Sequence, residues 1–477
     1  MSLLDSVKAK NYIDGNLVAY NEQLSVTNPS NMEIIGSIPN LSDESVISAV
    51  DTTVKAFQLW SKSTFEQRIT ILRKWYSLIL ENIDELAGVV TLEQGKVLED
   101  AKREILYGAS FIDWYAGAIH NIQGKIKPGK SYDHKIITEY EPVGPVAAIT
   151  PWNFPVAMVA RKVAPAIAAG CTVILKPSEF TPFSALILAK LAGDAGIPPG
   201  VLNVVTGNAN NIGQIFCNDF RIRKVSFTGS TRVGKILYKN SATTVKRLSL
   251  ELGGNAPFIV LGDTDLEKTA KELIIGKIRN SGQSCTSPNR IFIEDKIYQE
   301  FLQILTKHYK NIKVGDGFWQ ESDIGPLINS AAVTKILELL EDAKNKGAEI
   351  VSGGNALKNF FEPTIVKDCQ SNMNIFSTEI FGPVLACYKF STIEEVIAKS
   401  NDTEYGLQAY IYCQNIATAQ MIASRLDFGM VSINDPLPAN AKGAFAGRKN
   451  SGFGIEGSDE GIFEYLNSKY VNYKLLT

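Results

Sequence analysis

The segment RNSGQSCTSPNR, residues 279–290, holds one cysteine, Cys285, among small and polar neighbours and between two arginines. A cysteine acts as a nucleophile through its thiolate, which forms most readily in an electropositive or amide-rich setting. Arg279 brings positive charge close by, and Gly282 permits a close approach of the backbone. The alternative is a small residue that fills a core. The segment therefore predicts a candidate nucleophile whose base must come from elsewhere.

The base is hard to find among the histidines, because the chain has only three and none lies close to Cys285 in sequence. A cysteine–histidine protease is therefore disfavoured. The segment LELGGNAP places Glu251 at the end of an expected strand, just before a glycine pair. A carboxylate in an apolar setting can serve as a general base. Taken alone, Glu251 can equally be a capping or surface glutamate.

The turn TPWNFPV, residues 150–156, supplies a candidate hydrogen-bond donor. Pro151 and Pro155 fix this turn directly after an expected buried strand. Asn153 on the turn carries a side-chain amide, and at the carboxyl end of a strand such a donor suits an oxyanion hole. As an isolated signal, an ordinary turn asparagine is the stronger interpretation.

Two other strand ends carry residues suited to a dinucleotide. Lys176 and Glu179 of KPSEFTP could hydrogen-bond a ribose diol, the role of an acidic residue in other dinucleotide sites. Glu179 would also repel a 2′-phosphate, which favours NAD over NADP but leaves NADP use open. The segment FTGSTRVG, residues 227–234, predicts a strand, a turn and a helix start whose amides can meet a phosphate. It lacks the GxGxxG pattern, so a plain turn explains it as well.

The elements that must position these residues alternate along the chain. Residues 43–120 have helical periodicity, and from residue 145 short apolar runs alternate with helical patterns. This alternation predicts a doubly wound parallel sheet, which binds ligands at the carboxyl ends of its strands. A second α/β unit is expected over about 254–435, and the tail reads as a strand. The expected strands are 145–150, 171–177, 201–207 and 224–230, and the helices between them are 156–169, 181–195, 209–217 and 231–240.

Composition excludes several classes of function. The chain has 477 residues, a net charge of −2 and a pI of about 6.1. It therefore lacks the excess of positive charge that attracts nucleic acid or an anionic membrane. No apolar run reaches the roughly 18 residues of a membrane span, and the N-terminal residues lack a secretory signal. The six cysteines are scattered without a CxxC, which argues against disulfides and zinc. We expect a cytoplasmic protein without a metal, in which the five cysteines other than Cys285 are buried hydrophobes.

Six segments in a fixed order resemble the aldehyde dehydrogenase superfamily: PWNFP, KPSEFTP, FTGS, LELGGNAP, GQSC and EIFGPV. The resemblance extends from NYIDG at residue 11 to KYV at residue 471. It implies an α/β fold of two doubly wound parallel-sheet domains plus a small β-arm for oligomerisation, in a homodimer or homotetramer. The implied parts are a Rossmann-like NAD-binding domain from 1–122 and 144–253, a catalytic domain from 254–435, and an arm from 123–143 and 455–477.

The resemblance also implies a mechanism. Cys285 attacks the aldehyde, the Asn153 side chain and the Cys285 backbone N–H meet the oxyanion, hydride passes to the nicotinamide, and Glu251 activates the water that hydrolyses the thioester. The cofactor residues implied are Lys176 and Glu179 at the adenosine ribose, Gly229 and Ser230 at the pyrophosphate, Trp152 lining the cleft, and Glu379 and Phe381 at the nicotinamide ribose.

Within the superfamily the chain most resembles succinate-semialdehyde dehydrogenases, for example at IRNSGQSC. These bind the substrate carboxylate through two arginines, matched here by Arg161 and Arg279, and guanidinium recognises carboxylate through paired hydrogen bonds. A helix-surface charge is the alternative for Arg161, and an activator of the cysteine is the alternative for Arg279. The loop 433–454 departs from the pattern and places Ala439 where a serine is usual. Ser287 replaces a second cysteine, so we expect no disulfide switch.

Three other functions compete with this one. A lactaldehyde, glycolaldehyde or other small-aldehyde dehydrogenase shares the chemistry and differs around Arg279. A non-catalytic structural protein on this scaffold has no need for Cys285, Glu251 and Asn153 together. A thiol hydrolase or acyltransferase without a cofactor has no use for Lys176 and Glu179, and absence of NAD binding would favour it.

Overall fold

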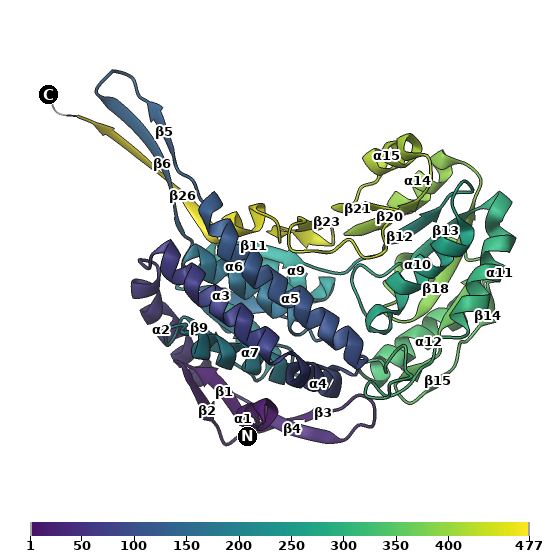
Figure 1. Ribbon diagram of the computed structural model, residues 1–477, viewed down its shortest axis with the longest axis horizontal. Helices are drawn as coiled ribbons and strands as arrows, with labels where there is room; N and C mark the ends of the chain where they lie inside the picture. The colour runs from purple at the N-terminus through teal and green to yellow at the C-terminus, as the bar shows by residue number, and fades with distance from the viewer. Residues whose placement is uncertain (1, 476–477) are drawn as a thin grey trace.

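The computed structural model describes residues 2–475 and has two units, each built on a large sheet, and a projecting arm (Figure 1). The first sheet has eight strands in the order β2-β1-β9-β8-β7-β10-β11-β24. Its five strands from β9 to β11 are parallel, and β1 and β24 pair antiparallel with them. The strands are β1 Lys10–Ile13, β2 Asn16–Ala19, β7 Val146–Ile149, β8 Val173–Lys176, β9 Leu202–Val204, β10 Lys224–Thr228, β11 Arg247–Glu251 and β24 Gly452–Phe453.

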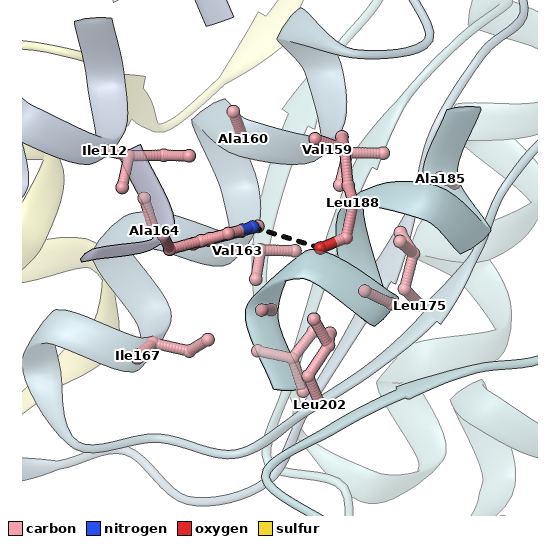
Figure 2. Close-up of a cluster of buried hydrophobic side chains, with 14 of the residues drawn as sticks. Ile112, Val159, Ala160, Val163, Ala164, Ile167, Leu175, Ala185, Leu188 and Leu202 are labelled. Atoms are coloured by element: carbon pink, nitrogen blue, oxygen red, sulfur yellow. Dashed lines mark hydrogen bonds between the residues drawn. The ribbon is translucent and has the colours of Figure 1, made fainter. Parts of the chain in front are cut away.

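Helices cover this sheet in the expected alternation. Ser42 caps α2, and a Thr64–Gln67 capping box begins α3. Figure 2 shows part of the core, where Ile112 of α5, Val163 of α6 and Leu188 of α7 lie together. The helices are α1 Leu3–Val7, α2 Asp43–Trp60, α3 Phe65–Glu81, α4 Ile83–Gln94, α5 Leu98–Ala118, α6 Ala157–Ala169, α7 Pro182–Ala195, α8 Ala209–Asn218 and α9 Thr231–Ser241.

The second sheet has seven strands in the order β14-β17-β18-β13-β12-β20-β21. All of its strand pairs are parallel except the edge pair of β14 with β17. Its strands are β12 Pro257–Val260, β13 Arg290–Glu294, β14 Glu349–Ser352, β17 Thr364–Lys367, β18 Val384–Phe390, β20 Gln408–Tyr412 and β21 Met430–Ile433. Its helices are α10 Leu266–Ile278, α11 Tyr298–Tyr309, α12 Ser330–Asn345, α13 Asn374–Ser377, α14 Ile393–Asn401 and α15 Ile416–Arg425.

The arm is a three-stranded antiparallel sheet in the order β26-β6-β5 that points away from both units (Figure 1). β26 and β6 pair over their whole length, from Leu466 opposite Pro142 to Lys474 opposite His134. The prediction of a strand in the tail is confirmed. The arm strands are β5 Lys125–Pro128, β6 His134–Pro142 and β26 Leu466–Lys474. Short pairs complete the structure: β3 Gln23–Thr27 with β4 Ile34–Pro39, β15 Ala356–Leu357 with β16 Phe360–Phe361, β19 Tyr405–Gly406 with β23 Arg448–Lys449, and β22 Phe445–Ala446 with β25 Ile455–Glu456.

The predicted doubly wound α/β fold is confirmed, and the four strands and four helices expected from residue 145 onwards lie where predicted to within a few residues. The sequence did not anticipate β24, which returns to the first sheet after the second is complete. Gly452 of β24 lies opposite Glu251 with φ 102°, and a Cβ there would come 1.9 Å from the carbonyl oxygen of Leu250. This strand pairing therefore depends on glycine. Within residues 2–475, no helix is long and apolar enough to cross a membrane.

Candidate active site

Cys285 follows an irregular turn that continues α10. Asn280 and Ser281 adopt left-handed φ angles of 51° and 56° in this turn. The Asn280 side chain donates to the Asn153 carbonyl at 2.9 Å and to the Gln283 carbonyl at 3.1 Å. These bonds tie the turn of the second unit to the Asn153 turn of the first, and Cys285 is thereby held at the junction of the two units.

Glu251 is the last residue of β11, and its Oε1 lies 3.2 Å from Sγ of Cys285. The carboxylate is 5% exposed, so the surface interpretation of Glu251 is wrong. Burial first, and then the charge of Glu251, raise the pKa of the Cys285 thiol well above its usual value, against the opposing charge of Arg161. The resting cysteine is therefore a thiol that donates to a ready proton acceptor.

Asn153 lies on the turn between β7 and α6, and its Nδ2 donates to the Gln283 carbonyl at 3.0 Å. Its own carbonyl accepts from Nζ of Lys96 at 2.7 Å. Lys96 also forms a fully buried ion pair with Glu104 at 2.5 Å, and Glu104 accepts from the backbone N–H of Val156 at the start of α6. This buried pair fixes the Asn153 turn from behind.

A cavity of about 300 Å³ opens on one side of Cys285. The rings of Trp152 and Phe381 meet edge to face across it, with centroids 5.6 Å apart. The Oγ1 atom of Thr228 is buried and has no hydrogen-bond partner among the described residues, although Thr228 lines the cavity. The site residues predicted from sequence that line this cavity are Trp152, Asn153, Gly229, Ser230, Glu251, Cys285, Glu379 and Phe381.

The residues around this cavity fit a nicotinamide dinucleotide. Ser230 caps α9 and is followed by free helix-terminal amides, and a Cβ at Gly229 would come 2.5 Å from the Phe227 ring. Lys176 ends β8, which pairs with β7, and its Nζ lies 2.9 Å from Oε2 of Glu179. Neither Lys176 nor Glu179 lines the cavity itself, but together they present a donor and an acceptor suited to a vicinal diol.

Glu379 closes the cavity from the second unit. Its Oε1 accepts from the backbone N–H of Gly254 at 2.9 Å, and its carbonyl accepts from Nζ of Lys335 at 2.6 Å. Burial raises the pKa of Glu379 to about 7, although the Gly254 N–H and the Lys335 charge partly oppose the change. The carboxyl group of Glu379 therefore changes its charge near neutral pH.

A second, narrow pocket lies on the other face of Cys285, between Arg161 and Arg279. The Arg279 guanidinium stacks over the Phe154 ring at 4.9 Å, and no acidic residue among 2–475 pairs with it. Ala439 lines this pocket as well, so the departing loop contributes to its wall. The cysteine thus separates a cleft suited to a dinucleotide from a pocket with an uncompensated cation.

Arg161 is 1% exposed, so the surface-charge interpretation is wrong. Its Nη2 donates to Oε2 of Glu251 at 2.8 Å, and its Nε lies 2.5 Å from Oε2 of Glu456. Lys162 forms a second buried ion pair with Glu456. The predicted substrate ligand is therefore also an immediate neighbour of the predicted base.

Sequence reasoning missed several residues of this site. Lys162 gave a usable signal, because two consecutive cations stand in an otherwise apolar helix that is buried throughout. Glu456 gave none, because it meets Lys162 across 294 residues of chain. The residues that were missed are Lys96, Glu104, Lys162, Thr228, Lys335 and Glu456.

A partly buried thiol beside a carboxylate, with a cleft whose lining suits a dinucleotide on one side and a cationic pocket on the other, is typical of an oxidoreductase that forms a covalent adduct with its substrate. The chain belongs to the aldehyde dehydrogenase family, whose model matches residues 18–471. It is 45% identical over 454 residues to the succinate semialdehyde dehydrogenase of Acinetobacter baylyi, covering 94% of each chain. It is 46% identical over 463 residues to the glutarate-semialdehyde dehydrogenase of Pseudomonas putida, covering 96% of each.

A solved structure described as an E. coli NADP dependent enzyme superposes with a TM-score of 0.97 at 43% identity, covering 99% of both chains. The predicted superfamily, fold class, enzymatic aldehyde oxidation and use of a nicotinamide dinucleotide are confirmed. Among residues 2–475, no three His, Cys, Asp or Glu side chains are grouped to hold a metal ion.

Proposed function

We propose that this enzyme oxidises succinate semialdehyde to succinate with NAD(P), through a thioester on Cys285. The observation that supports this substrate is the Arg279 guanidinium in the pocket beside Cys285, which pairs with no acidic side chain among residues 2–475. A guanidinium partly buried against an aromatic ring is well placed to receive a carboxylate in paired hydrogen bonds. The similarity to dehydrogenases of two carboxylated semialdehydes supports the same substrate class.

Cys285, Glu251 and Asn153 carry out the chemistry in this proposal. Cys285 transfers its proton to Glu251, and its sulfur bonds the aldehyde carbon. The resulting oxyanion accepts from the Asn153 side chain and the Cys285 backbone N–H. NAD(P), when bound in the cleft, supplies the acceptor for the hydride. Glu251 releases the cysteine proton to solvent, then takes a proton from the water that attacks the thioester, and returns it to the sulfur as the C–S bond breaks.

NAD is the preferred cofactor in this proposal. Lys176 and Glu179 hold the adenosine ribose, Gly229 and Ser230 meet the pyrophosphate, Trp152 lines the cleft, and Glu379 and Phe381 hold the nicotinamide ribose. The Glu179 carboxylate, 2.9 Å from Lys176, supports NAD because it would repel a 2′-phosphate. NADP use stays open, since Glu179 is half-exposed and free to rotate.

We further propose the division into an NAD-binding domain (1–122 and 144–253), a catalytic domain (254–435) and an oligomerisation arm (123–143 and 455–477). The arm supports a homodimer or homotetramer, because β5 and β26 are edge strands and expose Ile126 and Tyr470 by 72% and 64%. Removal of residues 467–477 should yield a smaller assembly in light scattering. A cytoplasmic location is also proposed, supported by five buried, unpaired cysteines besides Cys285.

Glutarate semialdehyde is the second candidate substrate. Ala439 lines the pocket where the resemblance places a serine, so the side chain there is one oxygen atom smaller, and the similarity to a glutarate-semialdehyde dehydrogenase supports this longer substrate. Lactaldehyde and glycolaldehyde are weaker candidates, because neither carries a charge to match Arg279.

The test is NADH formation across succinate semialdehyde, glutarate semialdehyde, lactaldehyde, glycolaldehyde and hexanal. Succinate semialdehyde should lead in kcat/KM by about tenfold or more, and Arg279→Met should cost about 10–150-fold with it, the value of a charged hydrogen bond. The matched control is Arg103→Met, since Arg103 lies at the outer opening near Arg279 but is 74% exposed. A neutral aldehyde in the lead, with the ranking unchanged in Arg279→Met, would reject the carboxylated substrate.

A further inference from the structure

The four buried charges beside Cys285 compensate one another. Arg161 and Lys162 are the cations, and Glu251 and Glu456 are the carboxylates. Although burial opposes it, the charges of Lys162 and Arg161 hold the pKa of Glu456 below its usual value. The cluster is therefore neutral before any substrate enters, and Arg161 already contacts two carboxylates, through Nη2 and Nε.

A substrate carboxylate in the pocket between Arg161 and Arg279 brings a further negative charge to this cluster. Arg279 supplies the matching positive charge, since it has no acidic partner within residues 2–475. Arg161 can offer Nη2 to the same carboxylate only in competition with Glu251, whose Oε2 accepts from it at 2.8 Å. The two arginines are thus unequal: Arg279 is free, and Arg161 is shared.

We propose that the substrate carboxylate draws Arg161 away from Glu251 and so frees this base for hydrolysis of the thioester. The proposal rests on the proposed function, because it requires a carboxylated substrate. Glu456 is the anchor in this exchange, since it holds the Nε side of Arg161 and is itself held by Lys162. The terminal nitrogens are then the part of Arg161 that moves.

The movement of Arg161 from Glu251 to the substrate carboxylate affects one chemical step, hydrolysis of the thioester. While its Oε2 accepts from Arg161, Glu251 can take the proton of Cys285, which lies against Oε1, but it cannot turn toward a water at the thioester carbon. Once released, Glu251 takes a proton from water as the water oxygen bonds the thioester carbon. The C–S bond breaks, the acid leaves, and the sulfur regains the proton. The carboxylate of the succinyl group is still present at this stage and keeps Arg161 occupied.

A neutral aldehyde lacks that carboxylate. Its acyl group leaves Arg161 on Glu251, so hydrolysis should be slower than formation of the thioester. Acetaldehyde gives a two-carbon acyl group, and acetate is the missing half of a succinyl group. Free acetate should therefore occupy the arginine pocket beside the acetyl group and release Glu251.

The experiment is rapid-mixing measurement of NADH formation by the intact enzyme with saturating NAD and acetaldehyde. We expect a burst of one NADH per active site and a slow steady state, which acetate accelerates about tenfold or more. Acetamide, which has the same shape without the charge, should have no effect. The acetate response should be lost in Arg279→Met and kept in Arg103→Met, whereas Arg161→Met should turn over acetaldehyde without a burst.

The outcomes separate this inference from the proposed function. If succinate semialdehyde is preferred but acetate only inhibits, or acts no differently from acetamide, the release of Glu251 is wrong and the proposed substrate stands. If succinate semialdehyde has no advantage and acetate has no effect, both are wrong. The comparison of acetate with acetamide needs only the wild-type enzyme, so a variant that fails to fold does not remove the test.

Discussion

Sγ of Cys285 and Oε1 of Glu251 lie 3.2 Å apart, although the two residues belong to units built on different sheets. Glu251 ends β11 of the first sheet, and Cys285 precedes β13 of the second. The nucleophile and its proton acceptor therefore meet only when both units are folded and docked. The distance between them reports on the junction of the two units.

The first prediction concerns the reactivity of Cys285. The charge of Glu251 raises the pKa of the thiol, after the larger effect of burial. Glu251→Gln should therefore lower this pKa and shift the pH curve of iodoacetamide labelling of Cys285 to lower pH. The same variant should slow aldehyde oxidation by about 10²–10⁴-fold, because the base is lost. A labelling curve that moves to higher pH would show that Glu251 promotes thiolate formation in the resting enzyme.

The second prediction separates chemistry from binding. Cys285→Ala should reduce aldehyde oxidation by about 10³-fold or more, because no other thiol among residues 2–475 lines the cavity. NAD binding, measured by fluorescence titration, should be retained. Cys413→Ala is the matched control and should remain active, since Cys413 lies beside Asp263 and outside the cleft. Full activity of Cys285→Ala would contradict the covalent mechanism.

The third prediction concerns the buried pair of Lys96 and Glu104, which supports the Asn153 turn. Lys96→Met leaves the buried Glu104 carboxylate without its cation and should lower the free energy of unfolding by about 3–5 kcal/mol in urea denaturation. It should also lower kcat by about 10²-fold, because the oxyanion donor is no longer held in place.

The double variant Lys96→Met/Glu104→Leu should recover part of the lost stability, since no unpaired charge remains. Lys102→Met, which breaks the exposed pair with Asp84, should change stability little. Equal effects of the buried and exposed lysines would contradict the assigned role of Lys96.

The fourth prediction is a pH dependence of cofactor affinity. Burial raises the pKa of Glu379 to about 7, so this group is mostly neutral at pH 6 and mostly ionised at pH 8. Ribose hydroxyls donate to the ionised form, so NAD should bind about tenfold more tightly at pH 8 than at pH 6. Glu379→Gln should flatten this dependence. If the pH dependence of NAD affinity persists in Glu379→Gln, Lys277 is the titrating group, because burial lowers its pKa to about 7 as well.

Without cofactor, the same group works against stability at high pH. The raised pKa of Glu379 means that the folded state binds this proton more strongly than the unfolded state. Its contribution to stability is complete below the unfolded pKa of about 4.5 and is lost as the pH rises through about 7. Thermal unfolding of wild type and Glu379→Gln across this range measures that contribution.

The fold was largely predictable because its signals are local. Each βα unit from residue 145 to 241 carries an apolar run, a turn and a periodic helix, and the structure follows these boundaries closely. β24 could not be predicted from the sequence, and the reason is physical. It is two residues long, and its place is set by backbone pairing with Leu250 and Glu251 from a distant part of the chain. No side-chain periodicity can show such a contact.

The site was predictable where residue type and strand end coincide, as for Glu251 and Lys176. The charged residues that surround the site could not be predicted, because buried ion pairs depend on contacts between distant parts of the chain. Arg161 was expected as a substrate ligand, with a helix-surface charge as the alternative, yet it lies buried between Glu251 and Glu456. Such a position follows from the packing of α6 against the returning segment, which local sequence does not reveal.

The return of β24 to the first sheet also sets an order of events during synthesis. β11 leaves the ribosome about 200 residues before β24, an interval of about 10–40 s at ordinary rates of translation. During this time the edge of β11 beside Glu251 is uncovered, and β6 of the arm waits even longer for β26. In the proposed homo-oligomer, the complete arm therefore forms only after the site residues have all been made, so each subunit that assembles through it already contains a complete set of them.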